Sequence, residues 1–230
     1  MKPGQIDNMA TLEDEHWWFR ERRHLIGEAI KGIPASQALD IGAAAGGNTR
    51  VLEAAGWHST ALEYSATGVE LALARGLTVI QGDARKIPFE DDHFGLVVAF
   101  DVLEHIEEDQ QVVDEIARVV RPGGLVLIAV PADPRLWSEH DADVGHVRRY
   151  TRPELVALFD NDRFAIESVR SWNVLLRPVV ALRRRRSAGN DLTALPKIVN
   201  TALDLIIKAE RHLPVGSLPG VSLLLNARVR

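Results

Sequence analysis

Short apolar runs alternate with amphipathic stretches along most of the chain, a pattern typical of strands and helices that take turns in an α/β fold. The run FGLVVAF at 94–100 is apolar throughout and predicts a strand that is buried on both faces. The pattern is therefore that of an α/β protein with a doubly wound, Rossmann-like sheet. Six further strands are predicted at 38–41, 60–63, 77–81, 125–130, 164–172 and 221–229.

Between these strands, apolar residues recur at helical spacing. One predicted helix begins at Thr151 and has Glu154 three residues on, which is the pattern of a capping box. Residues 132–150 follow neither period, so we predict a functional loop over the strand ends. An insertion at 173–220 precedes the last strand. The predicted helices are 13–33 (one helix or a helix pair), 47–56, 66–75, 107–120 and 151–160, with a turn at 187–190 and a helix at 196–213 inside the insertion.

The segment ALDIGAAAGG at 38–47, which joins the first strand to the next helix, has two interpretations. Gly42, Ala44 and Gly47 approximate the G-x-G-x-x-G fingerprint of dinucleotide-binding proteins. Asp40 argues against a dinucleotide, because its carboxylate would point to the place where the pyrophosphate meets the helix N-terminus. S-adenosylmethionine carries a sulfonium and an ammonium and has no phosphate. The acid therefore favours this methyl donor.

Polar side chains also follow the later strands, where a doubly wound sheet places its ligand. Glu63 ends the second strand and is suited to the ribose hydroxyls, and Tyr64 is suited to packing beside the adenine. Asp83 offers an acceptor to the adenine amino group. The segment DVLEH at 101–105 leaves the fourth strand, at the end that should face the transferred methyl group.

In this order, the segments resemble the motifs of class I S-adenosylmethionine-dependent methyltransferases over residues 36–131. The motifs are DIGAAAG, Glu63, GDA at 82–84, FDVLEH at 100–105 and RPGG at 121–124. The resemblance implies a seven-stranded, mostly parallel sheet with an antiparallel last strand, and S-adenosylhomocysteine as product. The family usually has glycine at position 44, so the methyl of Ala44 narrows the approach to the cofactor. The expected cofactor-binding residues are Asp40, Gly42, Ala43, Gly46, Glu63, Tyr64, Asp83, Ala84, Phe100, Asp101, His105, Trp18 and Arg20.

Two further segments, EHWWFR at 15–20 and GHVRRYT at 145–151, are similar to those of a small bacterial subgroup of the family. Trp17 and Trp18 form either a lid over cofactor or acceptor, or part of the core. Arg148 and Arg149 either bind an anionic part of an acceptor or pair with nearby acids. The expected acceptor-binding residues are Trp17, Asp141, Arg149 and Tyr150.

Histidines are the candidates for catalysis. Methyl transfer is an in-line displacement in which positioning supplies most of the rate, but a hydroxyl acceptor also needs a base, and imidazole accepts a proton at neutral pH. We predict His146, His140 and His105 for this role, with a structural role at a helix start as the alternative for His105. The segment HDADVGH at 140–146 could also hold a divalent metal or be tied by its own hydrogen bonds. We predict no metal ligands.

Composition limits the organisation of the chain. Its 230 residues, 46% hydrophobic, suit one domain over 1–230, and the absence of cysteine excludes disulfides and cysteine-ligated metals. No signal peptide or membrane span is recognisable, so we expect a cytoplasmic protein. Within this domain, the parts are an N-terminal helical lid at 1–34, a cofactor-binding core at 35–131, an active-site loop at 132–150 and a helical insertion at 173–220.

Charge is divided unevenly. Residues 1–162 hold 15 basic and 28 acidic side chains, a net charge of −13, whereas residues 163–230 hold 12 and 4, a net charge of +8. The acidic part argues against a nucleic-acid partner. The basic run lies among apolar residues at near-helical spacing, which suits contact with an anionic membrane; a solvated turn or a homodimer interface are the alternatives. The run consists of Arg183, Arg184, Arg185 and Arg186.

These observations predict an S-adenosylmethionine-dependent methyltransferase that acts on a small-molecule acceptor. The expected reaction is O-methylation of a sugar or a specialised metabolite. The alternatives are a nicotinamide-dependent Rossmann oxidoreductase, an N- or C-methyltransferase of a lipid-linked or natural-product acceptor, and a domain that keeps the fold without the activity.

Overall fold

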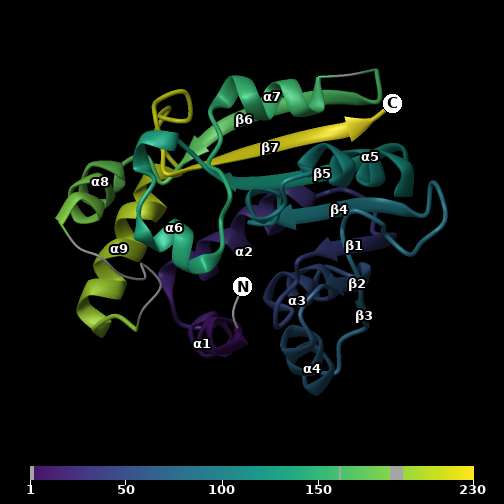
Figure 1. Ribbon diagram of the computed structural model, residues 1–230, viewed down its shortest axis with the longest axis horizontal. Coiled ribbons are helices and arrows are strands. Elements are labelled where there is room, and N and C mark those ends of the chain that lie inside the picture. The colour runs from purple at the N-terminus through teal and green to yellow at the C-terminus, as the bar shows by residue number, and fades with distance from the viewer. Residues whose placement is uncertain (1–2, 161, 187–193) are drawn as a thin grey trace.

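The computed structural model describes residues 3–160, 162–186 and 194–230 (Figure 1). A seven-stranded sheet has the order β3-β2-β1-β4-β5-β7-β6. Neighbours from β3 to β5 run parallel, and β7 runs antiparallel to both β5 and β6. The doubly wound, mostly parallel sheet with an antiparallel last strand is thus confirmed. The strands are β1 (Gln37–Ile41), β2 (His58–Glu63), β3 (Val79–Gln81), β4 (Phe94–Phe100), β5 (Val120–Pro131), β6 (Phe164–Trp172) and β7 (Ser222–Val229).

The order of the strands reverses between β1 and β4, because β1 leads outward to β2 and β3 whereas β4 leads to β5. All seven residues of β4 are buried, as its unbroken apolar run predicts. Ile41 lies beside Ala99 in the register, so the residues that follow β1 and β4 leave the sheet next to each other. Such a reversal is the point at which open α/β sheets bind ligands.

Helices cover both faces of the sheet, as Figure 1 shows. On one face, α5 and α7 contribute Ile116 and Phe159 to a core that includes residues of β4, β5 and β7. On the other, α2 and α3 contribute Ile26 and Leu52 to a second core. The sheet is therefore held from both sides, which fixes its strand ends. The helices are α1 (Pro3–Leu12), α2 (Trp17–Ile30), α3 (Gly47–Ala54), α4 (Ala66–Ala74), η1 (Leu103–His105), α5 (Asp109–Val119), η2 (Pro134–Leu136), α6 (Glu139–Val144), α7 (Arg152–Phe159), α8 (Arg177–Arg186) and α9 (Lys197–Glu210).

The N-terminal segment differs from the predicted helix at 13–33. The structure has α1 before this range, and α2 begins only at Trp17. His16 caps α2, since its Nδ1 accepts a hydrogen bond from the backbone N–H of Trp18 at 3.3 Å. The buried Glu13 instead turns toward α3 and α4, where it pairs with Arg50 and Arg75. These contacts join distant parts of the chain, so the local pattern of apolar residues could not predict where α1 ends and α2 begins.

The segment at 132–150 is more ordered than the predicted loop. It contains η2 and the six-residue α6, whose capping box joins Ser138 and Asp141. A helix this short shows less than two turns of periodicity, so the pattern of apolar residues misses it. The predicted capping box of Thr151 and Glu154 is confirmed at the start of α7.

The insertion between β6 and β7 forms α8 and α9, and the predicted helix at 196–213 is confirmed with slightly shorter bounds. The predicted turn at 187–190 lies outside the described residues. Asn200 of α9 accepts a hydrogen bond from the backbone N–H of Trp17 at 3.0 Å, which fastens the insertion to the start of α2. Figure 1 shows α6, α8 and α9 together beyond the strand ends. In the described ranges, no helix has the length and apolar character needed to cross a bilayer.

Candidate active site

A cavity of about 390 Å³ lies at the ends of β4 and β5, between α2, α6 and the insertion. Its lining joins parts of the chain that are far apart in sequence: the loop after β1, the starts of α2 and β7, and the helices of the insertion. The predicted site residues among its lining are Gly42, Ala43, Phe100, Asp101, His105, His140, His146, Arg149, Trp17 and Trp18.

The cofactor loop, residues 42–47, owes its course to three backbone positions in the left-handed region. Gly42 has φ +67°, and a Cβ there would lie 2.6 Å from Cγ2 of Val102. Ala44 adopts φ 49°, a conformation that favours glycine, and Gly46 has φ +83°. Glycine at position 42 thus allows the side chain of Val102 to pack against the loop, whereas Ala44 is held in a strained conformation.

Asp40 lies directly behind this loop and is almost fully buried. Thr49 donates a hydrogen bond to its Oδ2 at 2.6 Å, while Oδ1 has no hydrogen-bond partner in the described chain. Burial raises the pKa of Asp40 to about 7. A cationic ligand above the loop would favour the ionised carboxylate. An anionic pyrophosphate would oppose it, so the residues present fit S-adenosylmethionine.

Glu63 shapes the same loop. Its two carboxylate oxygens accept hydrogen bonds from the backbone N–H groups of Ala44, at 2.8 Å, and Ser65, at 2.7 Å. These two bonds fix the acid at the end of β2, where a ribose contact is predicted. That contact stays a prediction, as do those of the cofactor-binding residues in general.

Seven of the predicted cofactor residues lie outside the cavity lining of the described chain: Asp40, Gly46, Glu63, Tyr64, Asp83, Ala84 and Arg20. The side chain of Tyr64 is exposed, and Ala84 is buried in the core. Asp83 pairs with Arg85 at 2.7 Å, and this hydrogen bond lowers the pKa of Asp83. Arg20 lies on the outer side of α2, 3.8 Å from Asp204 of α9. Arg20 thus has a partner in the insertion, and its cofactor role stays a prediction.

Arg22, one turn after Trp18 on α2, lines the cavity, whereas Arg20 does not. Its guanidinium lies 2.7 Å from Oδ2 of Asp101, at the end of β4, and 4.8 Å from the centre of the Phe100 ring. Its Nη1 is buried without a hydrogen-bond partner in the described residues. The spacing of Trp18 and Arg22, four residues apart on one helix, was the signal in the sequence that could have identified it.

Three histidines, which we call the histidine wall, line one side of the cavity: His105, His140 and His146. The rings of His105 and His146 are 4.8 Å apart, and those of His140 and His146 are 6.3 Å apart. His105 Nδ1 lies 3.0 Å from the carbonyl oxygen of Gly145, and burial, followed by the charge of His146, lowers its pKa to about 4. The structure thus brings together all three of the predicted catalytic residues.

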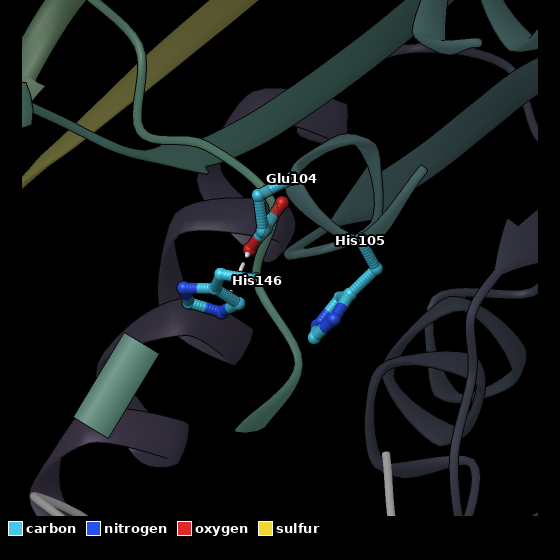
Figure 2. Close-up of side chains that lie close together, drawn as sticks. All are labelled: Glu104, His105 and His146. Atoms are coloured by element: carbon cyan, nitrogen blue, oxygen red, sulfur yellow. Dashed lines mark ion pairs between the residues drawn. The ribbon is translucent and has the colours of Figure 1, made fainter. Parts of the chain in front are cut away.

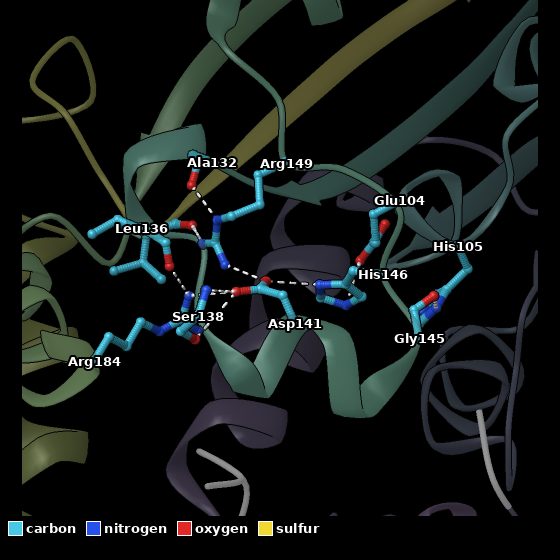
Figure 3. A network of polar contacts seen from close by, with 11 residues as sticks. Glu104, His105, Ala132, Leu136, Ser138, Asp141, Gly145, His146, Arg149 and Arg184 are labelled. Atoms are coloured by element: carbon cyan, nitrogen blue, oxygen red, sulfur yellow. Dashed lines mark hydrogen bonds and ion pairs between the residues drawn. The ribbon is translucent and has the colours of Figure 1, made fainter. Parts of the chain in front are cut away.

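Asp141 holds His146 of the wall in place, as Figure 3 shows. Its Oδ1 lies 2.9 Å from His146 Nδ1 and 2.6 Å from Arg149 Nη1. Burial alone would raise the pKa of Asp141, but the hydrogen bond to His146 and the charges of Arg149 and Arg184 hold it well below its usual range. Asp141 is therefore ionised and positions His146. It lies outside the cavity lining, which does not support its predicted contact with the acceptor.

Arg149 and Tyr150, which lie shortly after His146 in the chain, have different structural roles. Arg149 is buried and lines the cavity, while it also donates to the carbonyl oxygen of Ala132 at 2.8 Å. The Tyr150 hydroxyl donates to Asp109 at 2.7 Å, and burial raises the pKa of that hydroxyl. Arg148 pairs with the same carboxylate at 2.6 Å. Tyr150 thus fastens the segment to the start of α5, away from the cavity, and its predicted contact with the acceptor is not supported.

Comparisons with known proteins agree with this geometry. A family model described as a methyltransferase domain matches residues 39–128. The demethylmenaquinone methyltransferase of Clavibacter sepedonicus is 28% identical over 198 residues, covering 74% of this chain and 77% of that protein. The enzyme of the same name from Mycobacterium tuberculosis is 29% identical over 169 residues, covering 72% and 70%.

Solved structures share the fold. A chain in the complex between the Haloferax volcanii Trm112 methyltransferase activator and a methyltransferase superposes with a TM-score of 0.67 at 17% identity, covering 98% of this chain and 94% of that one. Geranyl diphosphate methyltransferase, solved with GPP and sinefungin, gives 0.64 at 16% identity, covering 91% and 78%.

These findings argue against the alternative of a nicotinamide-dependent oxidoreductase. A buried acid behind the loop, a strand-end acid that holds it and the family match all point to a methyl donor. S-adenosylmethionine is the cofactor, and its methyl group leaves S-adenosylhomocysteine behind. Because the matched region carries the cofactor loop and the sheet has the strand order of the family, this chain is a class I S-adenosylmethionine-dependent methyltransferase.

Proposed function

We propose that this enzyme transfers the methyl group to an oxygen atom of a small-molecule acceptor, such as a hydroxyl of a sugar or a specialised metabolite. The observation that carries the proposal is that the histidine wall and the cofactor loop line the same cavity. A methyl group presented from the loop side would meet an acceptor that rests on the imidazoles. The S–C bond breaks as the O–C bond forms, and the acceptor oxygen loses its proton.

The rest of the cavity suits an acceptor with an apolar part. Leu176, Val180 and Leu203 of the insertion line it on the side away from the cofactor loop. Arg149 and Arg184 supply positive charge close to the histidine wall. An amphiphilic acceptor would therefore place its apolar part against α8 and α9 and its polar hydroxylated part at the histidines.

A quinone-type acceptor is the second candidate. It is favoured by the relatives from Clavibacter sepedonicus and Mycobacterium tuberculosis, which are named demethylmenaquinone methyltransferases. Exposed apolar side chains continue outward from the cavity, with Val179 of α8 at 61% exposure and Ile198 of α9 at 84%. These positions, beside Arg183 and Arg184, suit a lipid-linked acceptor that is reached at an anionic membrane surface. The side chains of Arg185 and Arg186 lie outside the described residues.

Acceptor pairs that differ only at the reacting oxygen test the proposal. Release of S-adenosylhomocysteine is measured with sugars and with hydroxyaromatic compounds that have or lack an isoprenoid tail. Each acceptor is compared with its O-methyl ether, in which the hydroxyl is blocked. We expect turnover with at least one free hydroxyl compound and none with its ether. Equal turnover with both members of every productive pair would reject oxygen as the methylated atom.

A further inference from the structure

We propose that Glu104, His105 and His146 form a binding site for a divalent transition-metal ion at the acceptor end of the cavity. Figure 2 shows the three side chains together. One ligand atom from each lies within 4.8 Å of the others. The inference deepens the proposed function and rests on it only for the role of the ion, which would bind the acceptor oxygen.

The fold itself brings the three residues together. Glu104 and His105 lie in η1, directly after β4, whereas His146 follows α6. The backbone N–H of Val147 donates to the Glu104 carbonyl at 2.7 Å, and His105 Nδ1 lies 3.0 Å from the carbonyl oxygen of Gly145. These contacts hold the two segments side by side, so the ligand set does not depend on a mobile arrangement of exposed side chains.

Glu104 provides an independent observation. Its side chain is completely buried, and neither carboxylate oxygen has a hydrogen-bond partner in the described chain. Nε2 of His146 lies 3.7 Å from Oε1 of Glu104, which is beyond hydrogen-bond distance. A buried carboxylate without partners is costly, and proteins normally pair it with a cation or a metal. A metal ion between Glu104 and the two imidazoles would supply that partner.

The hydrogen bonds of the histidines also match those of metal ligands. Nδ1 of His146 lies 2.9 Å from Oδ1 of Asp141, which leaves Nε2 directed toward Glu104. In His105, the contact of Nδ1 with the Gly145 carbonyl likewise leaves Nε2 available. Metal-binding histidines usually donate their other N–H to a carboxylate or a backbone carbonyl, which fixes the tautomer. Both forms of this support occur here.

The ligand types narrow the choice of ion. Two imidazoles and one carboxylate suit Zn²⁺, Co²⁺, Fe²⁺ or Mn²⁺ better than Ca²⁺, and three protein ligands leave coordination positions open. His105 and His146 line the cavity, so the open positions face the acceptor. Metal–nitrogen bonds are about 2.0 to 2.1 Å long for zinc, so the side chains would move closer together on binding.

The ion would assist the transfer in a simple way. An acceptor hydroxyl bound to it has a lowered pKa and releases its proton to water. The oxygen then attacks the methyl carbon, the S–C bond breaks, and its electron pair stays on the sulfur of S-adenosylhomocysteine. The ion is unchanged at the end. This role explains why Glu104, beside the histidine wall, has a carboxylate that no hydrogen bond satisfies in the described chain.

Metal binding can be measured without donor or acceptor. The full chain is freed of metal with a chelator, dialysed, and titrated with Co²⁺, whose visible absorption reports its coordination, and with Zn²⁺ by calorimetry. We expect one saturable site, with affinity reduced at least 10-fold in Glu104→Gln and His146→Asn. His140→Asn, in the wall but outside the ligand set, and the exposed His93→Asn should bind like the wild type.

Glu104→Gln keeps the shape of the side chain and replaces the carboxylate by an amide, so it is expected to fold, and circular dichroism verifies this. Absence of a saturable site in the folded wild type, or unchanged affinity in folded Glu104→Gln, would overturn the metal site. The proposed function is judged separately. O-methylation that persists in chelator retains that function and rejects the role of the ion, whereas metal binding without O-methylation retains the site and rejects the function.

Discussion

Arg22 of α2 and Asp101 at the end of β4 form an ion pair of 2.7 Å beneath the N-terminal helices. The Arg22 side chain is buried, while that of Asp101 is about one-third exposed toward the cavity. Asp101 adopts φ 57°, a conformation that residues other than glycine seldom adopt without support. The pair therefore links the position of α2 to the strand end that is predicted to face the transferred methyl group.

Replacing Arg22 by methionine keeps most of the apolar stem and removes the charge. We expect weaker binding of S-adenosylhomocysteine, because Asp101 loses its partner and α2 is no longer held over the cavity. A hydrogen bond to a charged group contributes about 1.5 to 3 kcal/mol, which corresponds to roughly a 10- to 100-fold loss of affinity. Calorimetric titration measures the change.

Arg20→Met is the matched control, since Arg20 lies two residues away on the outer side of the same helix. Its affinity for S-adenosylhomocysteine should stay within about 2-fold of the wild type, in line with the small contribution of exposed ion pairs. If Arg20→Met weakened binding and Arg22→Met did not, the assignment of the two arginines would have to be reversed.

Replacing Ala44 by glycine is not expected to destabilise the protein, unlike most substitutions of alanine by glycine. Its φ of 49° costs an alanine roughly 1 to 2 kcal/mol, whereas glycine adds only about 0.4 to 1 kcal/mol of entropy in the unfolded chain. Ala44→Gly should therefore maintain or raise the free energy of unfolding, measured by urea denaturation. The exposed Ala202→Gly within α9 should lower it by about 1 kcal/mol. Equal losses in both variants would show that Ala44 is not strained.

Asp40 makes the stability of the ligand-free protein depend on pH. Its pKa is about 7 in the folded protein against 3.8 ordinarily, so the folded state keeps a proton that the unfolded state releases between these values. Stability from this group is complete below about pH 4, falls as pH rises to 7 and is constant above. The pKa difference sets an upper limit of about 4 kcal/mol.

Asp40→Asn removes this titration while its amide oxygen can still accept from Thr49. The free energy of unfolding of Asp40→Asn minus that of the wild type should therefore increase between pH 4 and pH 7. Denaturant titrations at several pH values provide the measurement. A difference that is flat over this interval would mean that Asp40 titrates normally.

Glu63→Gln is nearly isosteric, yet it should destabilise the cofactor loop. The two carboxylate oxygens of Glu63 accept hydrogen bonds from the backbone N–H groups of Ala44 and Ser65. A glutamine side chain has only one oxygen, so its NH₂ group would face one of these two N–H donors. An unsatisfied buried donor costs about 1 to 3 kcal/mol. We expect a loss of this size in the free energy of unfolding, accompanied by weaker cofactor binding. Wild-type values for both would contradict the support that we assign to Glu63.

Local patterns predicted the part of the fold that local physics determines. The unbroken apolar run of β4, together with Asp40 at the end of β1 and the glycines after it, indicated the point where the strand order reverses. Burial on both faces and a tight turn each require particular residue types at consecutive positions, so both can be recognised in the sequence. Long-range pairings leave no such trace. The pair of Arg22 and Asp101 and the approach of His146 to Glu104 arise from packing across the sheet, and the same holds for the short helix α6.

The position of the transferred methyl group tests the central claim most directly. The enzyme is incubated with S-adenosylmethionine labelled with ¹³C in the methyl group and with the best acceptor of the paired series, and the product is examined by NMR. The account predicts a labelled methyl whose ¹³C shift and long-range proton correlations show that it is bonded to oxygen. A labelled methyl bonded to a ring carbon, as a quinone-type C-methylation would give, would contradict it.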